Sequence, residues 1–426
     1  MHNTIRVGAT AVDEFDDLVA AGRIGVAFQP IVDLRDRNVV AYEALARPPQ
    51  GASFLDVTSL FAEAYRRHRV AELDWACRAA VFTAALKHRV PPEVPLFVNV
   101  EPAALGVPPP VDVLDRLAAA TRQSRFVLEV TERSLANDPA ALIEAVERTR
   151  DVAIGIALDD VGADPASLAL MPLVAPDVIK LDLSLVQARP TPDVARIVNA
   201  VLAESERSGA TILAEGVESE RHLAVARSMG ATLGQGWLFG APQPLPAELA
   251  VSDHPLRLSS SPEQVGDTPF SIASKIRPPV RSSKDLLAAT SRHLENEILH
   301  SSGKAVLVSS FETVANFGAF TRRRYQRLAR ETVLTAVLGQ GMPSRPGEGV
   351  RGATLDPDDP LCREWTLVVL GSQFAAALIA RRISPTTPTD PGQFEAIITH
   401  NRDLVVAGAK SLLSRVPALA TSASSG

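Results

Sequence analysis

The 426-residue sequence predicts an α/β protein: a large closed barrel followed by a smaller α/β domain. Over the first 250 residues, short apolar runs that end in polar residues alternate with stretches of helical periodicity. Asn99, Glu129 and Asp159 each end such a run and lie 30 residues apart, about the length of one β-α-β unit. A polar stretch at 251–267 then separates a second periodic region, so we expect two domains.

Composition narrows the class of protein. Hydrophobic residues make up 46% and charged residues 22% of the chain, which is typical of a globular protein with a full core. The net charge of −6 argues against a duplex nucleic acid as partner. Cys77 and Cys362 are far apart, which indicates a reducing compartment without a disulfide framework. We find no secretory segment in the first 25 residues, and the apolar window 365–380 is too short to span a bilayer, so we expect a cytoplasmic protein.

The order of elements in the first half supports the barrel. A helix is expected at 11–22, and two strands at 24–33 and 39–45 are joined by a turn, as in a hairpin. Further strands are expected at 96–99, 126–129, 154–160, 178–182, 211–216 and from 235 onward. The helices expected between them cover 56–68, 71–88, 112–122, 139–149, 191–208 and 219–229. This many alternating units favours a closed barrel over an open sheet.

A buried apolar run at 153–158 ends in two adjacent acids, Asp159 and Asp160. Two neighbouring carboxylates repel each other in a dry pocket unless a cation lies between them, and hard divalent ions take such oxygen ligands. The alternative interpretation is an exposed turn or helix cap, where Asp is also common.

In a parallel barrel every strand delivers its last residues to one face, where active sites are built. We therefore expect the following residues to converge: Glu43, Asn99, Glu129, Asp159, Asp160, Lys180, Glu215 and Gln235. Such a cluster would hold one or two divalent ions, and two ions sharing Asp159 could grip a phosphodiester. Lys180 would then hold or deprotonate the attacking water, with a pKa lowered by the bound cations.

Each of these residues also has a simpler interpretation. Glu129 and Glu215 could be rim carboxylates, Asn99 could cap a loop, and Lys180 could form a structural ion pair. Together these alternatives require six strands to end in polar groups for unrelated reasons, so the metal site is favoured. No glycine-rich turn links a strand to a helix, which excludes a dinucleotide or P-loop fingerprint.

Eight segments carry a resemblance to a known family. They are Gln29-Pro30-Ile31-Val32, Glu43-Ala44-Leu45-Ala46-Arg47, Asn99-Val100-Glu101-Pro102, Glu129-Val130-Thr131-Glu132, Asp159-Asp160-Val161-Gly162, Ile179-Lys180-Leu181-Asp182, Glu215-Gly216-Val217-Glu218 and Gln235-Gly236-Trp237. In order and spacing, residues 20–245 resemble the EAL-domain cyclic di-GMP phosphodiesterases. The resemblance implies a modified (β/α)8 TIM-like barrel with one antiparallel strand, and hydrolysis of cyclic di-GMP to linear pGpG.

The resemblance also implies roles for single residues. Glu43, Asn99, Glu129 and Asp159 match the ligands of one metal, and Asp159 with Asp160 those of a second, so two Mg²⁺ or Mn²⁺ ions are expected. Lys180 matches the residue that activates water, with Glu215 and Gln235 around the second metal and the water. Arg47 matches a phosphate-binding position, and Gln29 and Leu45 match other substrate-binding positions. Glu132 matches an acid that steadies the loop after Asp160.

The loop after the Asp pair departs from the family pattern. Val161 replaces an aromatic residue, Asp164 replaces a glycine, and Pro165 adds rigidity. In the family this loop links the metal site to the interface of a homodimer, which we expect here too, so the change bears on rate and regulation. The alternative function is a barrel that binds cyclic di-GMP without turnover and signals through protein partners. A weaker alternative is hydrolysis of a different phosphodiester.

The second half predicts a smaller domain of helices and strands. Helices are expected at 282–299, 320–338 and 403–415, strands at 304–309, 366–370 and 375–380, and a Gly/Pro-rich loop at 339–360. The domain boundaries that follow are 1–250 for the barrel, 251–267 for a linker, 268–415 for this domain and 416–426 for a disordered tail.

Residues 268–385 resemble the DICT sensory domain, which accompanies cyclic di-GMP enzymes. The resemblance depends on Asp285-Leu286-Leu287, Arg322-Arg323-Arg324-Tyr325, Gly349-Val350-Arg351-Gly352 and Asp359-Pro360-Leu361 leading to Glu364-Trp365. It implies regulation through an unknown sensory ligand or protein partner. The basic run 321–327 is either a solvated helix face or a site for an anion or acidic partner.

Overall fold

The computed structural model describes residues 10–20, 22–104, 106–131, 139–150, 154–162, 167–187, 189–258, 268–300, 304–383 and 394–417. The chain divides into two compact units, one containing a closed eight-stranded barrel and the other a seven-stranded sheet. Among the helices in these ranges, none combines the length and the apolar character that crossing a bilayer requires.

The barrel strands follow one another around the ring in chain order. They are β1 (Gly25–Asp33), β2 (Val39–Arg47), β3 (Leu96–Asn99), β4 (Phe126–Thr131), β5 (Gly155–Val161), β6 (Val178–Leu181), β7 (Thr211–Ala214) and β8 (Leu233–Gln235). β1 is antiparallel to both β2 and β8, whereas β2 to β8 are mutually parallel. The expected modified (β/α)8 barrel with one antiparallel strand is therefore confirmed.

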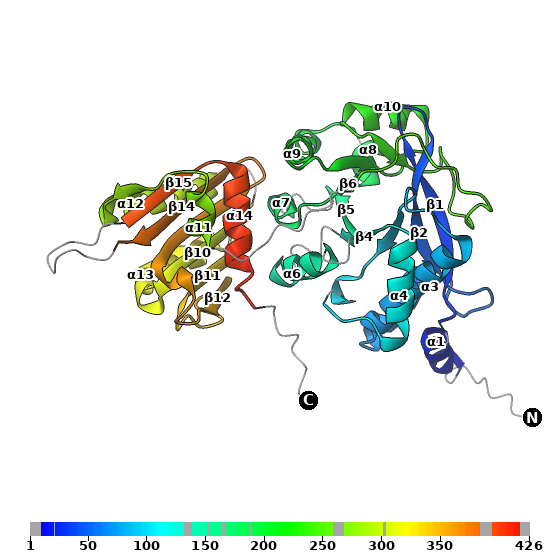
Figure 1. Ribbon diagram of the computed structural model, residues 1–426, viewed down its shortest axis with the longest axis horizontal. Coiled ribbons are helices and arrows are strands. Elements are labelled where there is room, and N and C mark those ends of the chain that lie inside the picture. Colours follow the sequence, from blue (N-terminus) through cyan, green and yellow to red (C-terminus); the bar gives the residue numbers. More distant parts are fainter. Residues whose placement is uncertain are drawn as a thin grey trace, which may run out of the picture. The chain divides into compact units, whose positions relative to one another are not determined.

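Helices lie outside the ring of strands, as Figure 1 shows. They are α1 (Thr10–Ala20), α2 (Val57–Arg66), α3 (Val70–His88), α4 (Val111–Gln123), α8 (Leu183–Gln187), α9 (Pro192–Ser208) and α10 (Glu220–Ser228). The helix α7 (Met171–Val174) and most of α6 (Pro139–Arg150) group with the other compact unit. The two short helices α7 and α8 were not expected from the sequence. Inside the ring, all eight strands contribute apolar side chains to one core, including Ile31, Phe97, Val127 and Leu213. The barrel is therefore a packed body with its polar groups at the strand ends.

The seven-stranded domain has the strand order β12-β11-β10-β13-β14-β15-β9. The bounds are β9 (Val280–Ser282), β10 (Ala305–Thr313), β11 (Thr332–Gln340), β12 (Val350–Thr354), β13 (Glu364–Gly371), β14 (Ala375–Arg382) and β15 (Phe394–Thr399). β10, β11 and β12 are parallel, and the remaining pairs are antiparallel. Its helices are α11 (Pro269–Ser274), α12 (Lys284–His300), α13 (Ala319–Leu328) and α14 (Arg402–Leu413).

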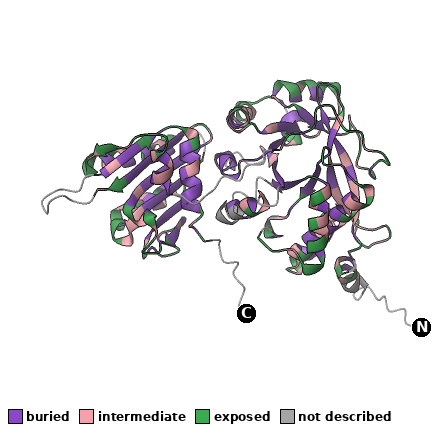
Figure 2. Ribbon diagram, viewed as in Figure 1, coloured by how far each residue is buried: buried purple, intermediate pink, exposed green. Residues whose placement is uncertain are grey.

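Helices cover both faces of this sheet, because successive strand residues point to opposite sides. Leu367 and Val369 of β13 join the core beneath α12 and α13. Val368, between them, approaches Gly408 of α14, which also lies near Pro269 of α11. The sheet is the middle of three layers, and its strands are largely buried in Figure 2.

Two expectations about this domain are wrong. The helix expected at 320–338 ends at Leu328, and its second half is β11, the strand that pairs with β10. The loop expected at 339–360 contains β12, whose Val350, Gly352 and Ala353 are buried. Residues 333–338 are apolar apart from Thr335, and such a run does not by itself distinguish a buried strand from a helix.

Candidate active site

Lys180 on β6 is the centre of the polar cluster at the carboxyl ends of the parallel strands. Its side chain is only 1% exposed, and its Nζ lies 2.5 Å from Glu129 Oε1 on β4. Nζ also lies 2.9 Å from Asp159 Oδ1 on β5 and 2.7 Å from Glu215 Oε1, directly after β7. Three strands thus direct carboxylates at one buried ammonium group, as expected from the barrel geometry.

A second set of polar side chains surrounds Glu43 in β2. Asn99 donates a hydrogen bond from Nδ2 to Glu43 Oε1 at 3.0 Å, and Gln235 donates from Nε2 to Glu43 Oε2 at 2.5 Å. Gln235 Nε2 also donates to Gln29 Oε1 at 3.1 Å, and Gln29 Nε2 is anchored by the carbonyl of Gly240. Amide side chains from three strands, β1, β3 and β8, therefore fix this carboxylate of β2.

A β-bulge explains how two consecutive acids reach one site. Neighbouring residues of a regular strand point to opposite faces, but here Leu158 pairs with Ile179 and Val161 with Leu181. Asp159 and Asp160 together therefore lie opposite the single residue Lys180, which is the arrangement of a bulge.

Asp160 has a φ of +57°, a left-handed conformation that Asp tolerates better than most residues. Carboxylate oxygens of Asp159, Asp160 and Glu215 consequently lie within 4.8 Å of one another. Backbone strain of this kind is typical of functional sites.

Two glycines let the neighbouring loops approach each other. Gly216, which follows Glu215, has a φ of +62°, and Gly236, which follows Gln235, has a φ of +152°. A Cβ at Gly236 would lie 2.3 Å from the carbonyl oxygen of Val217, so only glycine fits there.

The electrostatics of the cluster are those of an excess of buried negative charge. Burial, together with the charges of Glu43 and Asp159, raises the pKa of Glu129 well above its usual range. Burial likewise raises the pKa of Glu215 to about 8, with Asp159 and Glu43 adding to the effect. Burial alone would lower the pKa of Lys180, but the surrounding carboxylates raise it well above its usual value.

These residues fit a divalent cation. Glu129 Oε2 and Gln235 Oε1 are buried, and among the described residues neither finds a hydrogen-bond donor. Such atoms cost free energy unless a ligand satisfies them. The donor set consists of carboxylate and amide oxygens, which hard cations prefer. Asp159, Asp160 and Glu215 offer oxygens close enough to share one ion.

Two of the expected site residues, Arg47 and Leu45, have their described contacts outside this network. Arg47 donates from Nη1 to its neighbouring carbonyl, Ala46 O, at 2.9 Å. Leu45 is half-buried in the β1–β2 ladder opposite Ala27. Glu132 lies outside the described residues, as do Asp164 and Pro165 of the altered loop.

An interaction missed by the sequence analysis supports Asn99. Asp74 on α3 accepts a hydrogen bond from the backbone N–H of Glu101 at 2.9 Å, two residues beyond Asn99. Asp74 also forms a buried ion pair with Arg78, whose guanidinium lies 3.4 Å from the centre of the Trp75 ring. An Asp and an Arg four residues apart, among the apolar positions of the expected helix 71–88, were the available signal.

A TIM-like barrel with clustered carboxylates at the carboxyl ends of its strands defines a class of candidate metal-dependent enzymes. Within that class, the chain belongs to the EAL domain family, whose model matches residues 12–242. A second family model, "Sensory domain in DIguanylate Cyclases and Two-component system" (DICT), matches residues 270–383.

Curated relatives resemble the barrel part of the chain. Cyclic di-GMP phosphodiesterase NbdA of Pseudomonas aeruginosa is 31% identical over 243 residues, which cover 55% of this chain and 31% of the relative. Cyclic di-GMP phosphodiesterase RocR of the same organism is 28% identical over 240 residues, covering 52% and 58% respectively. This chain therefore spans less than two thirds of the length of either relative. A solved structure, the manganese/cy-diGMP complex of Klebsiella pneumoniae BlrP1 at pH 9.0, is 29% identical with a TM-score of 0.46, covering 52% of this chain and 56% of that one.

Proposed function

We propose that this protein is a metal-dependent phosphodiesterase that hydrolyses cyclic di-GMP to linear pGpG. The observation that carries the proposal is the convergence of carboxylates from four separate strands, β2, β4, β5 and β7, on the surroundings of one buried lysine. Two relatives of the barrel are named as cyclic di-GMP phosphodiesterases, which supports the choice of substrate.

In this proposal Glu43, Asn99, Glu129 and Asp159 hold one Mg²⁺ or Mn²⁺ ion, and Asp159 with Asp160 holds a second. When bound, the two ions supply Lewis-acid stabilisation of phosphate charge and a water molecule of lowered pKa.

The chain's own residues orient the reactants. Lys180 donates hydrogen bonds toward the attacking water, while Glu215 and Gln235 restrict where that water lies. Arg47 leaves its local carbonyl partner and pairs with a substrate phosphate, for which a guanidinium fork is suited.

The direct test is incubation of the protein with cyclic di-GMP and Mn²⁺ or Mg²⁺, followed by chromatography for pGpG. Glu43→Gln keeps the size of the side chain but removes its charge, so turnover should fall at least a hundredfold, since metal ligands dominate such sites. Glu248→Gln, which changes a carboxylate beyond β8, is the matched control and should hydrolyse at the wild-type rate. Wild-type protein that binds cyclic di-GMP without forming pGpG would contradict the enzyme and favour the receptor.

Other parts of the proposal concern the whole chain. We propose a homodimer, a C-terminal domain that regulates the barrel, and domain boundaries at residues 250 and 268. Size-exclusion chromatography with light scattering tests the dimer, because a monomeric mass at micromolar concentration would contradict it.

A further inference from the structure

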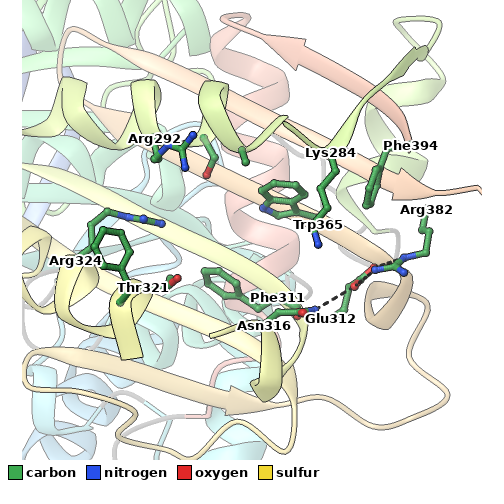
Figure 3. Close-up of a pocket in the computed structure, with 13 residues that line it drawn as sticks. Lys284, Arg292, Phe311, Glu312, Asn316, Thr321, Arg324, Trp365, Arg382 and Phe394 are labelled. Carbon is green, nitrogen blue, oxygen red and sulfur yellow. Dashed lines mark hydrogen bonds and ion pairs between the residues drawn. The ribbon is translucent and has the colours of Figure 1, made fainter. Parts of the chain in front are cut away.

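A cavity of about 340 Å³ lies in the seven-stranded domain, between α12 and α13 and above the sheet (Figure 3). Its floor includes Phe311 of β10 and Trp365 of β13, which are directly paired residues on adjacent strands. Phe394 of β15 extends this floor, with its ring centre 6.0 Å from that of Trp365. The base of the cavity is therefore an aromatic surface built on a rigid sheet.

One face of α12 forms the opposite wall. Lys284, Ala288, Ser291 and Arg292 line the cavity, and their spacing of four, seven and eight residues places them along the same side of the helix. The small Ala288 leaves room above the aromatic floor, and a cation lies at each end of the row. Lys284 and Arg292 are eight residues apart, so their backbones are separated by about 12 Å.

The cavity carries an excess of positive charge. Arg324 is compensated by Glu295 (Nε to Oε2, 2.6 Å), and Arg382 by Glu312 (Nη2 to Oε2, 2.9 Å). Lys284 and Arg292 have no acidic partner in the described part of the domain. Two lining cations therefore remain without a counter-charge, so the cavity favours an anion.

The charges are arranged along the length of the cavity. In Figure 3, Arg292 and Arg324 lie toward one end, with the Thr321 hydroxyl nearby. Lys284, Arg382 and Glu312 lie toward the other end, and Trp365 and Phe311 lie between the two groups. A ligand that satisfies this arrangement is elongated, with a planar middle and an acidic group at the arginine end.

A buried network holds the arginine end in place. Glu295 accepts hydrogen bonds on Oε1 from Tyr325 Oη at 3.1 Å and from Ser291 Oγ at 3.3 Å. Tyr325 Oη also lies 2.8 Å from Ser309 Oγ on β10. This network links α12, α13 and the sheet around the Glu295–Arg324 pair, so the Arg324 guanidinium is preorganised rather than free to swing.

We propose that this cavity binds a small, elongated organic anion whose planar ring stacks over Trp365 and Phe311 and whose carboxylate or phosphate pairs with Arg292. Guanidinium groups bind both kinds of acid through paired hydrogen bonds. The volume is at the lower end of the range of about 300–1,000 Å³ for small-molecule sites, which suits a single-ring or two-ring ligand.

The test uses the full-length protein and isothermal titration calorimetry with two probes, indole-3-acetate and adenosine 5′-monophosphate. Each is paired with its neutral counterpart, indole-3-acetamide or adenosine, so that the contribution of charge is measured directly. We expect at least one anion to bind at least tenfold more tightly than its neutral counterpart. The probe that binds distinguishes a carboxylate from a phosphate ligand.

Variants locate the binding site. Arg292→Gln removes an exposed charge without opening the core, so it should fold normally and weaken binding at least tenfold. Arg322→Gln is the matched control, because Arg322 is an exposed arginine of α13 that does not line the cavity. Unchanged binding by Arg292→Gln, equal binding of neutral and anionic probes, or no heat from either anion up to millimolar concentration would each overturn the proposal.

Discussion

At Asp160, local backbone strain coincides with a proposed metal-ligand position. Its left-handed φ of +57° and the bulge opposite Lys180 bring a second carboxylate into the site, within 4.8 Å of Asp159 and Glu215. Lys180 balances only part of this negative charge, so without a metal ion the remaining like charges should oppose folding, and with one they would act as ligands. We therefore expect this conformation to destabilise the metal-free protein and a bound metal ion to offset that loss.

We predict that Asp160→Asn separates these two effects. Asn tolerates the same backbone conformation but carries no charge, so in EDTA the free energy of unfolding should rise by about 1 kcal/mol. The increase in melting temperature on adding Mn²⁺ should be smaller than in the wild type, because one ligand is weakened. Thermal unfolding with EDTA and with Mn²⁺ measures both. Asp115→Asn, an exposed change on α4, is the control and should alter neither the free energy of unfolding in EDTA nor the rise in melting temperature on adding Mn²⁺. If Mn²⁺ raised the melting temperature of Asp160→Asn as much as that of the wild type, the metal site would be contradicted.

Gly236 gives a second prediction at this scale. An alanine there would push its Cβ against the Val217 carbonyl, so Gly236→Ala should lower the free energy of unfolding by more than about 3 kcal/mol. Gly209, at the end of α9, also has a positive φ, but no atom lies within 4 Å of the position that a Cβ would take there. Gly209→Ala should therefore lower the free energy of unfolding by only about 1–2 kcal/mol, which is the cost of holding an alanine in a left-handed backbone conformation. Urea denaturation of both variants measures the difference. Equal losses of unfolding free energy would contradict the prediction, because they would show that the backbone around Val217 moves to make room for the new Cβ.

At the scale of elements, α3 acts on the site through the segment after β3. Asp74 fixes the backbone of Glu101 and neutralises Arg78, and both charges are buried. Burial raises the pKa of Asp74 and lowers that of Arg78, so each depends on the other to stay charged.

Asp74→Ala should lower the free energy of unfolding by about 3–5 kcal/mol, because it leaves a buried guanidinium without a partner. Asp112→Ala removes the Asp of a similar i,i+4 pair with Arg116 on α4, but that pair is exposed and should contribute less than about 0.5 kcal/mol. Chemical denaturation tests the contrast. If the two variants lose equal stability, the Asp74–Arg78 pair does not have this structural role.

The sequence predicted the barrel elements well because polar residues mark where the strands end. Asn99, Glu129 and Asp159 lie at the ends of apolar runs, and the helices between them have clear periodicity. The convergence of these residues follows from topology alone. The bulge at Asp160 could not be predicted, because it depends on the pairing register between β5 and β6.

In the seven-stranded domain the prediction was weaker for physical reasons. β11 is buried on both faces, so its apolar run lacks the alternation that identifies a strand. β9 is only three residues long and two of them are exposed, so it has no core pattern at all. The cavity could not be inferred either, since it brings together residues from α12, α13 and four strands or their ends.

At the scale of the whole molecule, stability should depend on pH through a buried acid of the seven-stranded domain. Glu364 accepts a hydrogen bond on Oε2 from the Phe270 backbone N–H, which joins β13 to α11. Burial raises the pKa of Glu364 to about 6 from its ordinary value of 4.5. Because the folded state holds this proton more tightly than the unfolded state, its stabilising effect is present at low pH and is lost as pH rises through 6.

We predict that the free energy of unfolding of the wild type, relative to Glu364→Gln, falls by about 1–2 kcal/mol between about pH 4.5 and 7.5. Gln mimics the protonated acid and cannot ionise, while every other titrating group is common to both proteins and cancels. Urea denaturation at several pH values within this range measures the difference. If the free energies of unfolding of the two proteins changed in parallel with pH, a raised pKa for Glu364 would be contradicted.

The reversed direction of β1 has a practical consequence for anyone who labels this protein. Gly25 pairs with Arg47, so β1 begins at the rim where the parallel strands end and finishes at the opposite rim, where Asp33 pairs with Leu233. The preceding α1 packs near Ala46 and Phe54, beside the rim where the parallel strands end. A fluorescent tag fused directly ahead of α1 would therefore be attached beside the rim that holds the proposed nucleotide site.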